Sequence, residues 1–363
     1  MNALPAHTAP GPKTAGVFII DDSAVMRHLL AVVLGQDPAI EVIGTAADPL
    51  LALNRMNRRW PDVIVLDIEM PRMDGITFLK RLMAERPTPV VICSALSARG
   101  AATTIEALAS GAVAVVSKPA GLGAAEADSE GAMELLRAVK AASTARMSSL
   151  HHRPARPPAL APPMPLPAGS LVAAAISRVV AIGASTGGPL ALESVLSALP
   201  PEAPGILIVQ HMPAGFTAPF AERLNRNCAI EVREACDGDR VMPGLALIAP
   251  GGRHLQLRRC TTHYAVQVVD GPPVNRHRPS VDVLFRSVAA CAGRGALGIL
   301  MTGMGDDGAR GLAEMRCSGA ATVAQDEATS TVYGMPREAV ALNAAERVLP
   351  LGELAAAITA HVR

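Results

Sequence analysis

Two series of short Val/Ile-rich runs, separated by a proline-rich segment, constrain the fold of this chain more than any other feature. In the first series, from about Gly16 to Lys140, the runs alternate with amphipathic stretches typical of helices. Alternating strands and helices indicate a parallel sheet with helices on both faces. The sequence therefore predicts an α/β domain over residues 16–140, with strands at GVFIID, AIEVIGTA, DVIVLD, PVVICSA and AVAVVSKP.

The segment from His151 to Ser170 contains seven prolines, and such stretches favour extended spacers over packed structure. We therefore expect an interdomain linker over residues 141–176 and a disordered leader over residues 1–15. The 363 residues suit two domains of roughly 100 to 200 residues each. The second, over residues 177–363, is expected to be a doubly wound, mostly parallel α/β domain, with strands at RVVAIGAS, GILIVQ, LALIAP, HLQLRR, YAVQVVD, ALGILM and ATVAQ.

Charge and cysteine usage narrow the class of protein. The formal net charge of +1 provides no broad basic field, and no helix-turn-helix region is recognisable, so we expect no nucleic-acid partner. The six cysteines contain no CxxC pair and are interpreted as reduced, scattered core residues of a cytoplasmic protein. No uncharged apolar run approaches transmembrane length, so direct membrane insertion is not expected.

Polar residues end four strands of the first domain. Asp21 and Asp22 end the first strand, Asp67 the third, Ser94 the fourth and Lys118 the fifth. The carboxyl ends of neighbouring parallel strands meet in one crevice. Clustered carboxylates repel one another unless a cation is present, and their oxygens suit Mg²⁺. Any single Asp here is more often structural, but the combination predicts a site at which a carboxylate nucleophile takes up a phosphoryl group.

The segments DDS, LDIEMPRMDG, CSA and SKP together resemble the receiver domain of two-component response regulators, over about 120 residues. The resemblance implies a flavodoxin-like (βα)5 fold and phosphorylation of Asp67 by a histidine kinase. It also implies that Asp21 and Asp22 hold Mg²⁺ together with Asp67, and that Ser94 and Lys118 read out the phosphate.

Two details of the fifth strand qualify this resemblance. Many receivers carry an aromatic switch residue three positions before the Lys, whereas this chain has Val115. We therefore expect signalling to use other surfaces than an aromatic rotamer. The Lys118–Pro119 peptide is a candidate cis bond, because X-Pro bonds adopt cis at little cost.

In the second domain, RVVAIGASTGGPLALESVLSAL is typical of a strand, a glycine-rich turn and a helix. Ser185 lies in that turn within a G-x-S-x-G pattern, where a strained turn projects a serine and backbone N–H groups can hold an oxyanion. A phosphate-binding turn of a nucleotide domain is the alternative. The spacing is not G-x-G-x-x-G, and no Lys follows as in a P-loop.

A serine nucleophile needs a base and an acid that orients the base. His211 follows the strand GILIVQ, and Asp306 and Asp307 follow the strand ALGILM. Taken singly, His211 is more often a structural histidine and the Asp pair a helix cap. If the strands are neighbours, however, the three side chains face one cleft.

The segments GASTGGP, QHMP, TGMGDDGA, NRHRPSVDVLF and QDEATSTVYGMPREA resemble the catalytic domain of protein-glutamate methylesterases of the CheB family, over nearly the whole second half of the chain. The resemblance implies that Ser185 is the nucleophile, His211 the general base and Asp307 the residue that orients the histidine. The N–H groups of Thr186 and Met304 are oxyanion-hole candidates, and Asp306 receives no role.

The implied activity is hydrolysis of glutamate γ-methyl esters, and deamidation of certain glutamines, on the cytoplasmic helices of methyl-accepting chemotaxis receptors. A CheA-like histidine kinase would activate the enzyme by phosphorylating Asp67. The alternative is a non-enzymatic response regulator whose output domain binds a nucleotide or a protein. Arg276, His277 and Arg278 are interpreted as a solvated basic face or, less favoured, as a contact for an acidic substrate helix.

Overall fold

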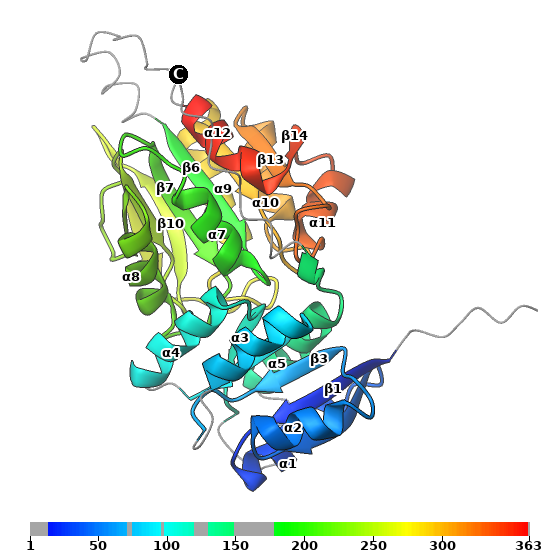
Figure 1. Cartoon of the computed structure of the whole chain (residues 1–363). Coiled ribbons are helices and arrows are strands. Elements are labelled where there is room, and N and C mark those ends of the chain that lie inside the picture. Colours follow the sequence, from blue (N-terminus) through cyan, green and yellow to red (C-terminus); the bar gives the residue numbers. More distant parts are fainter. Residues whose placement is uncertain (1–13, 71–74, 96–97, 120–129, 149–177, 362–363) are drawn as a thin grey trace, which may run out of the picture.

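The computed structural model describes residues 14–70, 75–95, 98–119, 130–148 and 178–361. Over these ranges the chain forms two α/β units, each built on its own parallel sheet, one coloured blue to teal and the other green to red in Figure 1. The predicted α/β class is confirmed for both units. The leader and most of the proline-rich segment lie outside the described residues.

The N-terminal sheet has five parallel strands in the order β2-β1-β3-β4-β5, which is the flavodoxin-like order. Every residue of β1 and β3 is buried because helices cover both faces of the sheet. The strands are β1 (Ala15–Ile20), β2 (Ile40–Ala46), β3 (Val63–Leu66), β4 (Val90–Ser94) and β5 (Ala114–Ser117). The helices are α1 (Ala24–Leu34), α2 (Pro49–Met56), α3 (Gly75–Glu85), α4 (Ala98–Ala109) and α5 (Glu130–Ser143).

The C-terminal sheet has seven parallel strands in the order β14-β13-β12-β6-β7-β9-β8. The chain enters at β6, winds outward to one edge and returns to the other side through β12, so the strand order reverses between β6 and β12. Ligand crevices in such sheets lie at the carboxyl ends of the strands at this reversal. The strands are β6 (Val179–Ala184), β7 (Gly205–Gln210), β8 (Glu231–Glu234), β9 (Leu245–Ile248), β12 (Ala296–Leu300), β13 (Ala321–Gln325) and β14 (Arg347–Leu349).

Helices and one hairpin cover this second sheet. The predicted strands HLQLRR and YAVQVVD form a separate antiparallel pair, β10 (His254–Arg259) and β11 (Tyr264–Val269). The helices are α7 (Gly188–Leu196), α8 (Thr217–Asn227), α9 (Val281–Ala292), α10 (Ala309–Cys317), α11 (Met335–Ala341) and α12 (Leu351–Ala360), with a short 3₁₀ turn, η3 (Gly293–Gly295).

Several smaller expectations differ from the structure. Helix α5 continues to Ser143, three residues beyond the expected end of the first domain. The cis peptide among the described residues is Arg278–Pro279, so the expectation for Lys118–Pro119 is wrong. The cysteines are all free, but Cys236 and Cys317 are exposed rather than in the core. No helix in the described ranges has both the length and the apolar character to span a bilayer.

The two units pack against each other. Helix α4 of the N-terminal unit contacts α7 and α8 of the C-terminal unit (Figure 1), and one cluster of buried apolar side chains includes residues of both. Beyond α5, the Arg146 N–H donates to the Thr331 carbonyl at 2.8 Å, and its guanidinium pairs with Glu327 at 2.5 Å. This packing places β5, an edge strand of the N-terminal sheet, over the carboxyl ends of β6 and β7.

Candidate functional site

An acidic cluster lies at the carboxyl end of the N-terminal sheet, where Asp21 and Asp22 follow β1 and Asp67 follows β3. Their carboxylates each offer an oxygen within 4.8 Å of the others. Asp21 and Asp67 are buried, with 1% and 2% of their surfaces exposed, whereas Asp22 is exposed. The fold therefore brings together the three carboxylates that the sequence predicts to meet, and this set of hard oxygen donors fits Mg²⁺.

Lys118, which follows β5, closes this cluster. Its Nζ lies 2.6 Å from Oδ2 of Asp67 and 2.9 Å from Oδ2 of Asp21. Burial raises the pKa of Asp67, and the nearby ammonium of Lys118 opposes this shift without cancelling it. Burial acts to lower the pKa of Lys118, but the two carboxylates raise it overall. The lysine therefore stays charged and offsets part of the repulsion between the carboxylates.

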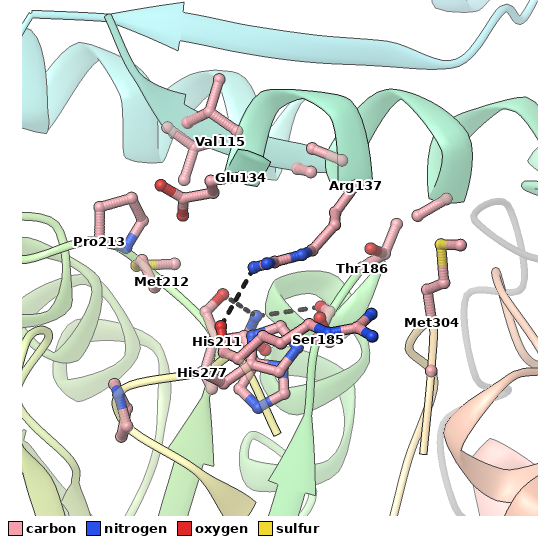
Figure 2. Close-up of a pocket in the computed structure, with 18 of the residues that line it drawn as sticks. Val115, Glu134, Arg137, Ser185, Thr186, His211, Met212, Pro213, His277 and Met304 are labelled. Atoms are coloured by element: carbon pink, nitrogen blue, oxygen red, sulfur yellow. Dashed lines mark hydrogen bonds between the residues drawn. The ribbon is translucent and has the colours of Figure 1, made fainter. Parts of the chain in front are cut away.

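Ser94 and Val115 lie on the neighbouring strands. Ser94 is the wholly buried last residue of β4, and its carbonyl accepts a 3.0 Å hydrogen bond from the Lys118 N–H. Its hydroxyl donates to the Ala95 carbonyl at 3.3 Å. Val115, in β5, lines the cavity between the two units (Figure 2). The position at which many receivers carry an aromatic residue therefore faces the second unit here.

The turn after β6 presents Ser185 at the start of α7. Gly187 has a φ of 77°, which favours glycine, and a Cβ there would lie 2.4 Å from the Thr331 side chain. The backbone of Ser185 is held from both sides, because its N–H donates to the Thr302 carbonyl at 2.9 Å and its carbonyl accepts from the Gln210 amide at 3.0 Å. The serine is therefore fixed between the ends of β12 and β7.

His211 follows β7, next to the strand that carries Ser185. Its backbone N–H donates to the Ala184 carbonyl at 3.0 Å, and its side chain is 7% exposed. Ring atom Nε2 lies 2.8 Å from Oδ2 of Asp307. The other ring nitrogen, Nδ1, is buried and has no hydrogen-bond partner among the described residues. The ring is thus anchored at one nitrogen and has a free polar atom at the other.

Asp307, in the loop between β12 and α10, is 1% exposed and accepts several hydrogen bonds. Burial alone would raise the pKa of the Asp307 carboxyl group. The hydrogen bond and the electrostatic attraction between Asp307 and His211, together with the other donors, lower this pKa well below the ordinary range. Asp307 is therefore ionised at neutral pH, and Nε2 of His211 carries the proton between them. Its donors are the His211 ring, the Asn275 amide, the Ser280 hydroxyl and the N–H groups of Val281 and Asp282.

The structure thus gathers Ser185, His211 and Asp307 at the reversal of strand order. The contact between the histidine and Asp307 is formed, whereas no hydrogen bond joins the Ser185 hydroxyl to Nδ1 of His211 in the part of the chain that the structure describes. Figure 2 shows the serine and the histidine at the base of the same cavity.

The two oxyanion-hole candidates flank the serine. Thr186 and Met304 both line the cavity, and no described residue accepts a hydrogen bond from the N–H of either. Thr186 is held by the Thr302 hydroxyl, which donates to its carbonyl at 2.9 Å. Two backbone donors are therefore available beside the serine.

Sequence reasoning missed three side chains that support this site. His277 stacks on His211, with ring centroids 3.7 Å apart and planes at 9°, so it is not part of a solvated basic face. Asn275 and Ser280 donate to Asp307. All three lie in NRHRPS, a segment without a strand or helix pattern. Only the resemblance of this segment to a family motif signalled a role.

A cavity of about 440 Å³ lies over these residues, between the two units. Figure 2 shows Arg137, from helix α5 of the first unit, pointing toward Ser185, His211 and His277. Its Nη1 donates to the Arg276 carbonyl at 3.1 Å. Burial, reinforced by the positive charge of Arg137 and opposed by the negative charge of Asp307, lowers the pKa of His277, so that its ring is neutral at pH 7. The first unit therefore contributes part of the wall around the candidate catalytic residues.

Comparison with known proteins identifies both units. Residues 17–126 match the family described as response regulator receiver domain, and residues 180–358 match the family described as CheB methylesterase. The chain is 58% identical to "Protein-glutamate methylesterase/protein-glutamine glutaminase 2" of Xanthomonas campestris, over 95% of this chain and 100% of that protein. It is 56% identical to a protein of the same name from Pseudomonas syringae, over 96% and 99%.

Among solved structures, the chain resembles the Thermotoga maritima CheB methylesterase catalytic domain, with 35% identity, a TM-score of 0.49 and coverage of 50% of this chain and 96% of that one. The two matched regions coincide with the two α/β units of the structure, and the relatives match along almost their whole length. This chain belongs to the CheB methylesterase family and carries an N-terminal response regulator receiver domain.

Proposed function

We propose that this protein hydrolyses glutamate γ-methyl esters, and deamidates specific glutamines, on the cytoplasmic helices of methyl-accepting chemotaxis receptors. The names of the relatives, protein-glutamate methylesterase and protein-glutamine glutaminase, support both reactions. The observation that carries the proposal is the buried contact of His211 with an ionised Asp307 beside Ser185. The protein would act in the cytoplasm, where those receptor helices lie.

Ser185 attacks the carbonyl carbon of the side-chain ester in the proposed first step. As the bond from Oγ to carbon forms, the hydroxyl proton passes to Nδ1 of His211, the ring nitrogen that Asp307 does not occupy. The imidazolium that results is stabilised by the carboxylate of Asp307, which stays ionised throughout. The N–H groups of Thr186 and Met304 are the proposed donors to the oxyanion of the tetrahedral intermediate.

The leaving group departs when the tetrahedral intermediate collapses. The proton on His211 passes to the departing atom, which is the methoxy oxygen of an ester or the amide nitrogen of a glutamine, so that methanol or ammonia is released. Water then attacks the acyl-enzyme, His211 takes its proton, and glutamate leaves as Ser185 regains its hydrogen. Both reactions share one acyl-enzyme, which explains how a single site can serve an ester and an amide.

The test of this site is methanol release from methylated receptor membranes. We expect Ser185→Ala to lose the activity, because the substitution removes the hydroxyl that is proposed to attack the ester carbonyl. Ser197→Ala, an exposed serine just after the same helix, is the matched control and should retain wild-type rates. Full activity of the Ser185→Ala protein would contradict the nucleophile assignment.

Regulation through the receiver domain is the second part of the proposal. Asp67 would accept a phosphoryl group from a CheA-like histidine kinase, and Asp21, Asp22 and Asp67 would hold Mg²⁺. When bound, Mg²⁺ supplies positive charge that neutralises the carboxylates and the incoming phosphate. Lys118 would pair with the phosphate instead of the bare carboxylate, and Ser94 would turn its hydroxyl from the Ala95 carbonyl to a phosphate oxygen.

The domain interface provides the route by which phosphorylation would reach the esterase. The Val113 carbonyl, just before β5, accepts a 2.9 Å hydrogen bond from the N–H of Gly187 in the serine turn. Val115 lies within β5, and Lys118 follows the other end of this strand. A shift of β5 on phosphorylation would therefore loosen contacts at the cavity and admit a receptor helix.

A nucleotide- or protein-binding output domain without enzymatic activity is the rival function. A phosphate cradle needs free N–H groups in the glycine turn, but the Gly187 N–H binds Val113 and the Gly188 N–H binds the Ser185 carbonyl at 2.8 Å. Thermal stabilisation by a nucleotide, without methanol release, would favour the rival.

A further inference from the structure

Asn275 lies between β11 and α9 with a backbone conformation that few residues adopt. Its φ is 50°, in the left-handed region that non-glycine residues other than Asn and Asp enter at a cost. The backbone thus favours Gly, Asn or Asp at this position. The side chain is what distinguishes these three residues.

The Asn275 amide nitrogen joins two buried carboxylates. It lies 2.8 Å from Oδ1 of Asp307 and 2.8 Å from Oδ2 of Asp282. Ionised carboxylates only accept hydrogen bonds, so the NH₂ group must face them, with one hydrogen for each. Glycine would leave both carboxylates without this donor, and aspartate would add a third negative charge.

Asp282 in turn holds the chain that carries Asp307. It is 1% exposed, and its Oδ1 accepts hydrogen bonds from the N–H groups of Gly308 at 3.1 Å and Gly311 at 2.7 Å. Gly308 directly follows Asp307, and Gly311 lies in the first turn of α10. The same carboxylate that binds Asn275 therefore fixes the backbone on the carboxyl side of Asp307.

These contacts form a closed unit around the proposed triad. Asn275 holds the side chain of Asp307, Asp282 holds its backbone, and the Asn275 amide connects the two. Asp307 fixes the plane of the His211 ring through the 2.8 Å contact at Nε2. A shift of this carboxylate would tilt the ring and move Nδ1 relative to Ser185, and misplacement of a catalytic group by an ångström lowers rates strongly.

We propose that Asn275 is a positioning residue for the esterase reaction, which acts by tying the carboxylate of Asp307 to that of Asp282. The inference rests on the proposed function, because it assumes that Ser185 and His211 act together. Ser280 donates to the same oxygen of Asp307 at 2.8 Å, but its hydroxyl makes no contact with Asp282 in the described structure. Ser280 therefore provides a hydrogen-bond donor to Asp307 but does not link Asp307 to Asp282 through its side chain.

The test measures how fast a fluorophosphonate probe labels Ser185 in the full-length protein. Labelling forms a bond from Oγ to phosphorus with loss of fluoride, and intact mass reports it without a receptor substrate. We expect Asn275→Gly, which keeps the backbone conformation, to lower the maximal labelling rate roughly 10- to 100-fold while the half-saturating probe concentration changes less than about twofold. Ser280→Ala should lower the rate by less than about fivefold.

Asn343 supplies the matched control, since it also has a left-handed backbone, with a φ of 53°, but binds Arg316 on the surface. Asn343→Gly should label like wild type. Wild-type labelling rates in Asn275→Gly would overturn the positioning role and leave the proposed function intact. Failure of the wild-type protein to be labelled at Ser185 would instead overturn the proposed function, and this inference with it.

A measurement on the unaltered protein covers the case in which Asn275→Gly does not fold. With ¹⁵N-labelled asparagine, both side-chain amide protons of Asn275 should resonate downfield and exchange slowly, because each is hydrogen-bonded to a buried carboxylate. A rapidly exchanging proton on this amide would overturn the proposal.

Discussion

Asp67 and Asp307 are the same residue type, lie at the carboxyl ends of parallel strands and are both almost wholly buried, yet their pKa values shift in opposite directions. Asp307 accepts five hydrogen bonds. Asp67 is contacted by Lys118 and by the Glu69 N–H at 3.1 Å. The difference indicates that hydrogen-bond donors outweigh the effect of burial on the pKa of Asp307, whereas the contacts of Asp67 do not outweigh it.

This contrast matches two different tasks. A residue that orients a histidine should remain ionised and immobile through every turnover, so a full set of donors suits it. A carboxylate that binds a metal and accepts a phosphoryl group should keep oxygen lone pairs available. The number of hydrogen-bond donors from the protein therefore distinguishes Asp307, the proposed orienting residue, from Asp67, the proposed reactive residue, more clearly than burial does.

Replacement of Asp307 should have the largest effect. In Asp307→Asn, an amide NH₂ would face several donors, so we expect kcat to fall roughly 10³- to 10⁴-fold and the free energy of unfolding to fall by about 3 to 5 kcal/mol. Methanol release and urea denaturation measure the two losses. An unchanged stability would break the comparison, because it would mean that the five donors are not needed by the carboxylate.

Addition of Mg²⁺ should stabilise the protein through Asp67 and its neighbours. At a free Mg²⁺ concentration 100 times the Kd, linkage predicts about 2.7 kcal/mol of added stability. A thermal-unfolding series in Mg²⁺ should show this rise in wild type and a smaller rise in Asp67→Asn. Equal rises in the two proteins would place the metal elsewhere.

The pH dependence of stability should differ between the two carboxylates. Because the folded pKa of Asp67 is raised by burial above the unfolded value of about 3.9, ionisation of Asp67, beside Asp21 and Lys118, costs stability as pH rises through the folded pKa. Without metal, the Tm of Asp67→Asn relative to that of wild type should therefore rise as pH increases above about 4. A difference in Tm between the two proteins that does not change with pH would argue against a raised pKa of Asp67.

Asp307 should show the opposite sign. Its folded pKa is lowered, so its contribution is fully present above the unfolded pKa and is lost only as pH falls through the folded value. The deficit of Asp307→Asn should stay constant above about pH 5 and shrink only in strong acid. Tm measured across this range tests both carboxylates in one series.

Loosening the domain interface should have the smallest effect. The ion pair of Arg146 with Glu327 is half-exposed, and exposed pairs contribute about 0 to 1 kcal/mol. Arg146→Ala should therefore raise esterase activity without phosphorylation by no more than about fivefold. A drop in basal activity would show that this contact supports the esterase instead of restraining it.

The sequence was sufficient for the parts that obey strand-end chemistry. Asp21 and Asp67 directly follow apolar runs, and Lys118 follows one after a single serine, so a parallel sheet alone predicts that the three residues meet. Two strands of the second sheet were missed because β8 (EVRE) and β14 (RVL) are polar or short edge strands without an apolar run.

The surroundings of Asp307 could not be predicted in this way. Asn275, His277 and Ser280 lie in a segment with no periodic pattern, and their contacts depend on how that loop folds against the loop after β12. The strand pattern also could not separate Asp306 from Asp307. The family resemblance selected Asp307, and the structure shows that Asp307 is the buried member of the pair, in contact with His211.

The most direct test of the whole account follows methanol release from methylated receptor membranes by the full-length protein, before and after addition of a CheA-like kinase, ATP and Mg²⁺. Wild type should accelerate on phosphorylation, whereas Asp67→Asn should stay at its basal rate and Ser185→Ala should release no methanol. Full activation of the Asp67→Asn protein would contradict the proposal that the buried carboxylate of the receiver controls the esterase.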